Sequence, residues 1–390
     1  MYRRNYHVSD GDKKQLHIHN KSDKPDNVVM KENQIIEDCE TLQKQLPSWM
    51  RGYFSYLRGN LLPMSRRGYL QDIRFFCQYL IDETDLTNAE STRDIKESEF
   101  REITAVDVNL FLDYCRRYKK ETDKAIYVYE NANKSLARKR SSVSVLFKYL
   151  YRSGIIEKNI TDGFDPIRLP KPGERQIKAL QDDEVMRMLD AVTTGEGLTK
   201  HERTYWEKTK YRDKCILMYF VTYGLRLSEL QQLNVSSFNF SRGEFLIYRK
   251  RGKESTMPLN KTTIKALQDY LDLERPTDDS LEEEHKDALF LSLQGKRMTE
   301  RQIRELVKKY TSICMDTTRR NGYSPHKLRA TAATSLIGRG NDIYDVQVLL
   351  DHDNVTTTQL YAAHKLNTKR DLIKSFEWGD DLEEYLDEEE

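Results

Sequence analysis

Apolar residues recur at helical spacing through the first half of the chain. One stripe follows a suitable N-cap at Ser65 and consists of Tyr69, Ile73, Phe76 and Leu80. Similar patterns predict a helix that starts near Thr104 and another that follows Ser135 and stops at Gly154. Residues 41–165 are therefore predicted to form an all-helical domain.

The chain on either side of this domain has a different character. Residues 1–40 are polar and show little periodicity, so we expect a flexible or marginally helical extension there. Three prolines and a glycine fall within residues 165–175. That composition is typical of an extended connection, which we place at residues 166–178.

The second half is predicted to be a mostly helical domain, residues 179–376, followed by an acidic tail over residues 377–390. Segments 244–249 and 254–259 indicate a two-stranded antiparallel hairpin. Residues 193–210 are expected to form a loop or an irregular insertion. Helices are expected over residues 182–192, 215–223, 228–233, 262–273, 299–315, 326–339, 343–350 and 356–364.

Composition limits the class of protein. A length of 390 residues suits two domains, and 38% hydrophobic residues suffice for two cores. The chain has no run of about 18 apolar residues, and its first residues lack the apolar stretch of a signal peptide. Its five cysteines have no CxxC spacing, so neither disulfides nor a zinc site is expected. We therefore expect a cytoplasmic protein with no membrane span.

The net charge of +1 conceals an uneven distribution of charge. The C-terminal tail is strongly acidic, whereas basic residues cluster elsewhere, and local patches govern affinity for nucleic acid more than the total charge does. Each cluster by itself is more typical of a solvated helix face. The candidates for contact with DNA phosphates are Arg66, Arg67, Arg138, Lys139, Arg140 and Lys253.

Four features of the second domain bear chemically versatile side chains. An arginine follows a glycine at the start of a helix, and a lysine lies near the hairpin turn. A histidine and an arginine three residues apart share one helical face. A second histidine precedes a tyrosine by nine residues. Taken singly, each is more often a salt-bridge partner or a core residue. In chain order they are Arg226, Lys250, His326, Arg329, His352 and Tyr361.

Together, in this order and at these spacings, these residues resemble the tyrosine recombinase and integrase family, and its bacterial Xer branch in particular. Arg226 and Lys250 are 24 residues apart, and 23 residues separate Arg329 from His352. The resemblance extends from about Leu46 to Phe376, because the first domain looks like the family's core-binding domain. It implies a mostly α fold, in which a helical core-binding domain precedes an α-rich catalytic domain with a small antiparallel sheet.

The resemblance assigns the arginines to the phosphate. Arg226 and Arg329 would each grip non-bridging oxygens through a planar fork of donors, a geometry that lysine does not reproduce. Such donors stabilise the extra charge of the transition state. Glu229, one helical turn after Arg226, matches a supporting acidic position and would help to orient the site.

The remaining roles concern proton transfer and covalent chemistry. By resemblance, Tyr361 attacks phosphorus and forms a 3′-phosphotyrosyl link, with His326 as its base. Lys250 would protonate the departing 5′ oxygen, although Lys253 in the same hairpin is an alternative. His352 would donate a hydrogen bond to the phosphate or to Tyr361. No metal or other cofactor is implied.

Two positions depart from the family's usual pattern. Ala330 stands where a histidine often follows the His-x-x-Arg motif, and Asp351 stands where a glycine often precedes the second histidine. Neither residue carries the expected chemistry directly, so these departures concern local packing.

The resemblance also implies partners. Double-stranded DNA with a specific recombination site would be the substrate, and four copies of the chain would assemble on it. The short N-terminal extension favours an Xer-type role, the resolution of chromosome dimers, with a DNA translocase as a candidate partner. Alternatives are an integrase of a transposon or conjugative element, a type IB topoisomerase, and a non-catalytic DNA-binding protein.

Overall fold

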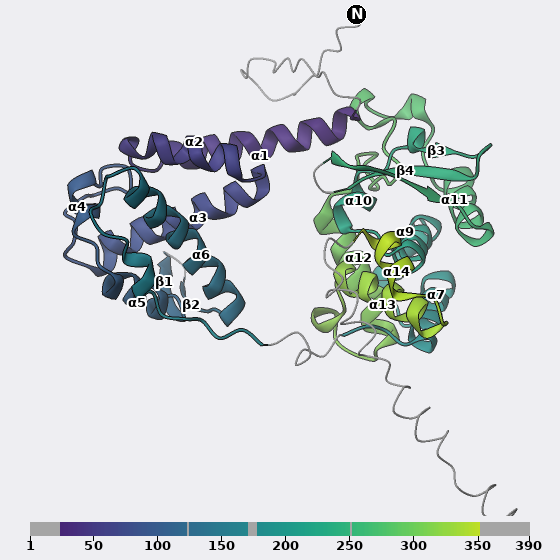
Figure 1. Ribbon diagram of the computed structural model, residues 1–390. Helices are drawn as coiled ribbons and strands as arrows, with labels where there is room; N and C mark the ends of the chain where they lie inside the picture. Colours follow the sequence, from purple (N-terminus) through teal and green to yellow (C-terminus); the bar gives the residue numbers. More distant parts are fainter. Residues whose placement is uncertain (1–23, 123–124, 171–177, 250–251, 352–390) are drawn as a thin grey trace, which may run out of the picture. The chain divides into compact units, whose positions relative to one another are not determined.

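The computed structural model describes residues 24–122, 125–170, 178–249 and 252–351. The helix predicted over residues 356–364 and the acidic tail predicted over residues 377–390 lie outside the described residues. The chain separates into two compact units that divide between Leu169 and Pro170. Helices predominate in both units and the sheets are small and antiparallel, so the predicted fold class is confirmed (Figure 1).

The first unit consists of six helices and one hairpin within its described residues. The elements in chain order are α1 (Asp26–Lys44), α2 (Arg51–Asn60), α3 (Pro63–Glu83), α4 (Glu97–Arg101), α5 (Ala105–Tyr114), β1 (Arg117–Thr122), β2 (Ala125–Glu130) and α6 (Asn133–Arg152). Short 3-10 turns precede α2 and follow α6.

Two helix starts in this unit show how the residues at a helix N-terminus favour its formation. Helix α5 begins directly after Thr104, as expected, and the Thr104 backbone N–H donates to the Asp107 carboxylate at 2.8 Å. The predicted cap at Ser65 is wrong, because α3 already begins at Pro63. Proline is well suited to the first helical position, where its fixed φ is helical and its missing N–H would have had no partner.

Helix α1 contains all of residues 26–40, for which a flexible or marginally helical extension was expected, so this part of the extension is a regular helix. Its buried side chains are Val28, Val29, Cys39 and Leu42, and α1 packs against α3. These apolar residues are sparse in a polar sequence, so their periodicity is weak. Burial against α3 stabilises a helix that its own sequence signals poorly.

The core of the first unit combines aromatic packing with one buried carboxylate. The Phe76 ring lies 4.9 Å from that of Phe111, centroid to centroid. Asp72, on the same helix as Phe76, is buried and accepts hydrogen bonds from Arg138, from Lys139 at 3.4 Å and from Ser142 at 2.8 Å. This cluster ties α3 to α6.

The β1–β2 hairpin is an element that the hydrophobic pattern did not predict. Its strands pair from Arg117 with Glu130 to Thr122 with Ala125. At its base the Tyr118 ring stacks on Tyr129, with centroids 5.1 Å apart, and on Tyr114 at 5.5 Å. Almost every residue of the hairpin is exposed, so the hairpin has no buried face that the hydrophobic pattern could have indicated. The stack of Tyr118 on Tyr129 joins the two strands, and the stack of Tyr118 on Tyr114 attaches the hairpin to α5.

The second unit is a helical bundle with a three-stranded sheet of order β3-β4-β5. Figure 1 shows the sheet at one end of the bundle and α7 and α13 toward the other. The elements are α7 (Asp182–Thr194), α8 (Lys200–Trp206), α9 (Lys210–Tyr223), α10 (Leu227–Gln231), β3 (Phe238–Asn239), β4 (Glu244–Tyr248), β5 (Glu254–Pro258), α11 (Lys261–Leu273), α12 (Glu300–Cys314), α13 (Pro325–Gly338) and α14 (Ile343–Leu350).

Most expectations for this unit are confirmed to within a few residues, including the hairpin, in which Tyr248 pairs with Glu254. The loop predicted over residues 193–210 is partly wrong, because α8 forms there. Thr199 caps α8 by accepting from the Glu202 N–H, and Trp206 is buried against the core. No described helix is both long enough and apolar enough to cross a membrane.

Asp72 provides a test of the first unit. Asp72→Ala leaves the buried Lys139 ammonium without its counter-charge, so we expect the free energy of unfolding to fall by about 3 kcal/mol. Urea denaturation of the full-length protein measures this change. Asp82→Ala, an exposed position on the same helix, is the control and should change stability by less than about 0.5 kcal/mol. Equal effects of the two substitutions would contradict the role of Asp72 as the buried counter-charge of Lys139.

Candidate active site

The site begins at the turn between α9 and α10. Gly224 caps α9 in the left-handed conformation, with φ of 58°. A Cβ built on it would lie 2.5 Å from a methyl carbon of Leu350 and 3.3 Å from Ala332. Glycine is therefore needed twice, for its backbone conformation and for the close approach of α13 and α14. This turn brings the start of α10 beside the end of α14.

Arg226 lies at the start of α10 and is held by Glu229. Its backbone N–H donates to one carboxylate oxygen of Glu229 at 2.7 Å, and its Nη1 donates to the other at 2.6 Å. Glu229 is only 3% exposed, so this bond orients the guanidinium firmly. The Nη2 group donates to the backbone carbonyl of Asp351 at 2.9 Å. The supporting role predicted for Glu229 fits this arrangement.

Arg329 lies on α13, three residues after His326. It is 3% exposed, and its guanidinium donates to the carbonyl of Gly224 at 2.7 Å and to the carbonyl of Leu350. His326 is exposed in the first turn of α13, directly after Pro325. The two residues lie three positions apart on one helix, so a buried arginine and an exposed histidine share one helical face.

A third arginine, which belongs to the basic sequence Arg249-Lys250-Arg251, joins this cluster. Arg249 follows β4 and is buried, and its Nη2 donates to the carbonyl of Leu349 at 2.7 Å. Burial lowers the pKa of its guanidinium, while Glu229 and Asp351 act in the opposite direction. No sequence signal separated Arg249 from its basic neighbours, because the distinction is its burial.

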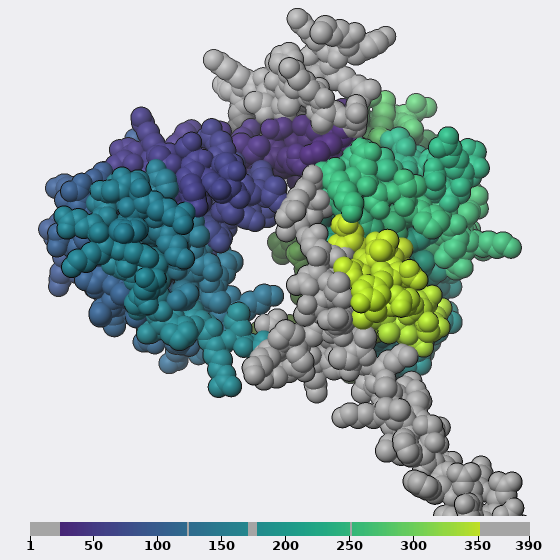
Figure 2. All heavy atoms as spheres, viewed as in Figure 1, coloured from purple at the N-terminus to yellow at the C-terminus, as the bar shows by residue number. Residues whose placement is uncertain are grey.

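The three arginines thus converge on three successive carbonyls at the end of α14, those of Leu349, Leu350 and Asp351. The last carbonyls of a helix have no partners within the helix, and they carry its partial negative charge. Figure 2 shows α14, in yellow, at the surface of the second unit. The guanidinium groups therefore determine where the chain leaves α14.

Asp351 also brings its side chain into this cluster. One carboxylate oxygen lies 2.7 Å from the Lys253 ammonium, and the other lies 3.8 Å from Nη1 of Arg226. Partial burial acts to raise the pKa of Asp351, but Lys253, Arg249 and Arg226 together lower it. The carboxylate is therefore ionised at neutral pH.

Of the predicted catalytic residues, Arg226, His326 and Arg329 lie within the described part of the chain, with Glu229 and Lys253. Lys250, His352 and Tyr361 lie outside the described residues. Lys250 directly follows Arg249 in sequence, and His352 directly follows Asp351.

Comparisons with known proteins agree with this arrangement. The model of the phage integrase family matches residues 178–368. The chain is 31% identical to the tyrosine recombinase XerC of Natranaerobius thermophilus over 75% of this chain and 91% of that protein. It is also 31% identical to XerC of Caldanaerobacter subterraneus subsp. tengcongensis over 80% of each. The chain belongs to the tyrosine recombinase family.

Solved structures agree on the fold of this tyrosine recombinase. The XerH site-specific recombinase, bound to its palindromic difH substrate after cleavage, has a TM-score of 0.59 and 17% identity over 89% of this chain and 90% of that one. Residues 82–397 of the Tn1549 transposon integrase, in complex with circular intermediate DNA, have a TM-score of 0.53 and 18% identity over 86% and 98%.

Family membership makes the protein an enzyme that cleaves and rejoins DNA strands. The cationic cluster is suited to this chemistry. With residues that the structure describes, the Arg226 guanidinium makes two hydrogen bonds. An arginine side chain has five N–H donors, so further donors remain to meet the oxygens of a phosphodiester.

Four of the five basic residues predicted to contact DNA in the first unit of the recombinase have partners for their side chains. Arg138 and Lys139 bond to Asp72, and Arg67 lies 3.3 Å from Asp38. Arg140 donates to the carbonyls of residues 164 and 165, and Arg66 is buried. Their contacts to DNA stay predictions, which require that such a side chain also reach outward or exchange its partner.

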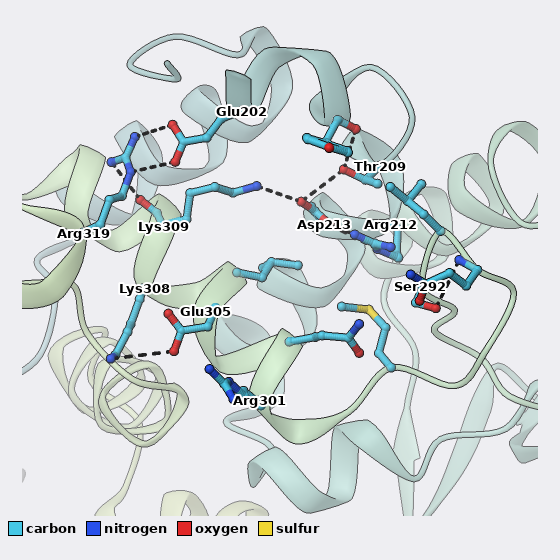
Figure 3. Close-up of a pocket in the computed structure, with 16 residues that line it drawn as sticks. Glu202, Thr209, Arg212, Asp213, Ser292, Arg301, Glu305, Lys308, Lys309 and Arg319 are labelled. Carbon is cyan, nitrogen blue, oxygen red and sulfur yellow. Dashed lines mark hydrogen bonds and ion pairs between the residues drawn. The ribbon is translucent and has the colours of Figure 1, made fainter. Parts of the chain in front are cut away.

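A cavity of about 580 Å³ lies elsewhere in the second unit, among α8, α9 and α12 (Figure 3). None of the predicted site residues lines it. Several of its charged groups are paired: Arg319 donates to both oxygens of Glu202 at 2.9 Å, and Lys309 lies 3.3 Å from Asp213. The Arg319 hydrogen bonds lower the pKa of Glu202 to about 2. These pairs join α8 and α9 to α12 and its neighbouring turn.

Among the described residues, one group of three potential metal ligands lies together. The ligand atoms of Glu282, Glu284 and His285 are within 4.8 Å of one another. The His285 imidazole is 3.1 Å from the Glu284 carboxylate, and the group shares no residue with the arginine cluster.

Gly224 tests the packing of the site. Gly224→Ala combines an unfavourable backbone conformation with a clash against Leu350, so we expect a loss of about 3 kcal/mol in the free energy of unfolding. Thermal and urea denaturation measure it. Gly338→Ala, at the exposed end of α13 with no atom within 4 Å of its added Cβ, should be neutral or slightly stabilising. A neutral Gly224→Ala would show that α14 does not pack as described.

Proposed function

We propose that this protein is a site-specific recombinase of the Xer type, which acts on a particular site in double-stranded DNA through a 3′-phosphotyrosyl intermediate. The observation that carries the proposal is the arginine cluster at the end of α14. It is a preorganised set of donors directly before the segment that contains His352 and Tyr361.

In the proposed reaction, the Tyr361 oxygen attacks phosphorus in line with the 5′ oxygen of the scissile bond. A new bond forms between phosphorus and the tyrosine oxygen as the bond to the 5′ oxygen breaks. His326 accepts the phenolic proton, and Lys250 donates a proton to the departing 5′ oxygen. His352 donates a hydrogen bond to the phosphate. The phosphotyrosyl link keeps the energy of the broken bond, so a 5′ hydroxyl can reverse the reaction.

Arg226 and Arg329 supply the electrostatic part of the mechanism. Both are fixed by Glu229 or by backbone carbonyls before DNA arrives, so little reorganisation is required when charge develops on the phosphate. A lysine in either place would keep the charge but lose the fork of donors.

The biological role is argued from the relatives. Recombinases named XerC match most of this chain at about 31% identity, which supports an Xer-type role in resolving chromosome dimers. Such a protein would work in the cytoplasm, assemble as a homotetramer on DNA, and could take a DNA translocase as partner. The fold shared with the Tn1549 integrase supports the second candidate, integration of a mobile element. Recombination assays on the sequences that flank the gene distinguish the two.

A suicide substrate tests the chemistry. A duplex nicked next to the cleavage point loses the strand end that would religate, so the wild-type protein should accumulate as a covalent DNA complex on a denaturing gel. Tyr361→Phe should abolish this complex and leave DNA affinity within about twofold, because only one oxygen is removed. Tyr344→Phe, at an exposed position on α14, is the matched control. A complex that survives Tyr361→Phe would refute the proposed nucleophile.

The general acid is tested by changing the leaving group. Lys250→Ala should slow cleavage by about 10²-fold to 10³-fold. A substrate with sulfur in place of the bridging 5′ oxygen should restore the rate, because a thiolate departs without a proton. Lys253→Ala should show no such rescue. Rescue of Lys253→Ala in place of Lys250→Ala would transfer the role of acid to Lys253.

A further inference from the structure

The carboxylate of Asp351 occupies the cationic cluster that is proposed to receive the scissile phosphate. It lies 2.7 Å from Lys253 and 3.8 Å from Arg226, and its side chain is 17% exposed. A carboxylate and a phosphodiester present the same feature to these cations, a negative charge shared between oxygens that accept hydrogen bonds. The site therefore contains an anion of its own.

This carboxylate contributes little that its helix requires. The C-terminal end of a helix disfavours a negative side chain, because the last carbonyls are themselves partly negative. Asp351 has φ of 51°, a conformation that suits glycine or asparagine at least as well. It is the backbone carbonyl of Asp351, and not its side chain, that binds the Arg226 guanidinium through Nη2. The attraction of the neighbouring cations is what holds the side chain.

The link to Lys253 can be broken at small cost. The Lys253 side chain is 66% exposed, and ion pairs with an exposed partner contribute at most about 1 kcal/mol. A phosphodiester that also contacts Arg226 and Arg329 offers several charge-assisted hydrogen bonds in exchange. The carboxylate can therefore leave when DNA binds, and it costs binding energy each time that it does.

We propose that Asp351 competes with the scissile phosphate for Arg226 and Lys253, and that it thereby weakens productive binding of DNA. The inference rests on the proposed function, because it takes the arginine cluster as the phosphate site. A competitor of this kind stabilises the free enzyme and not the transition state. It therefore raises the DNA concentration needed for half-maximal rate and leaves the maximal rate nearly unchanged.

Two substitutions at Asp351 remove the charge and fit the backbone. Asp351→Asn keeps the shape of the side chain, and Asp351→Gly removes the side chain at a positive φ. Asp345→Asn is the matched control, because it removes the same charge from an exposed position on α14. It corrects for the general effect of net charge on DNA affinity.

The experiment has two measurements. In the Tyr361→Phe background, fluorescence anisotropy with a duplex that carries the recombination site should show about tenfold tighter binding for both Asp351 variants, and less than about twofold for Asp345→Asn. With the tyrosine intact and the suicide substrate, the rate of covalent-complex formation is measured in single turnover as a function of DNA concentration. Both Asp351 variants should lower the DNA concentration for half-maximal rate by a similar factor and change the maximal rate by less than about twofold.

The outcomes separate the possibilities. Unchanged affinity, or an equal gain for Asp345→Asn, would overturn the proposal. A lower maximal rate of covalent-complex formation for Asp351→Asn would also overturn it, and would make Asp351 a positioning residue for Lys253. Absence of any Tyr361-dependent covalent complex would count against the proposed reaction, whereas the anisotropy measurement would still decide whether Asp351 competes with bound DNA.

Discussion

The second unit depends on the attraction between three guanidinium groups and the C-terminal end of α14. Arg226, Arg249 and Arg329 come from three different elements, and they donate to three successive carbonyls. A helix end offers these carbonyls in any case, because they have no partners inside the helix. The same contacts hold the arginines, so one set of hydrogen bonds both completes the fold and prepares the site.

This arrangement needs close packing as well as charge. Gly224 allows α9 to end where Leu350 and Ala332 approach, and its own carbonyl accepts a hydrogen bond from Arg329. A side chain at Gly224 would separate α14 from the turn and move the carbonyls that the arginines bind. The geometry of the proposed phosphate site therefore rests on a residue whose side chain takes no part in the proposed reaction.

In both units, cations that are predicted or proposed to contact DNA also interact with a carboxylate of the protein. In the first unit, Arg138 and Lys139 belong to the predicted DNA surface and also neutralise the buried Asp72. In the second, Asp351 neutralises cations that are proposed to bind phosphate. The net charge of +1 thus describes the surface poorly, since each unit balances cations internally before any DNA is bound.

The sequence by itself determined much of this protein. Periodicity located most helices and the β4–β5 hairpin, and the order Arg226, Lys250, His326, Arg329, His352, Tyr361 indicated the family. These features are local or depend on chain order, so they can be recognised from the sequence without a structure. Weak or exposed elements were missed: α1 has few apolar residues, and the β1–β2 hairpin has almost no buried face.

Only the tertiary structure decided which charged residues lie together. Sequence could not distinguish Arg249 from its basic neighbours, and it could not predict that the Asp351 carboxylate reaches Lys253, 98 residues away. Such contacts depend on how distant segments pack, and packing is set by the summed shapes of many side chains. Arg226 could be named from the sequence, whereas the carbonyl that holds it could be found only in the folded chain.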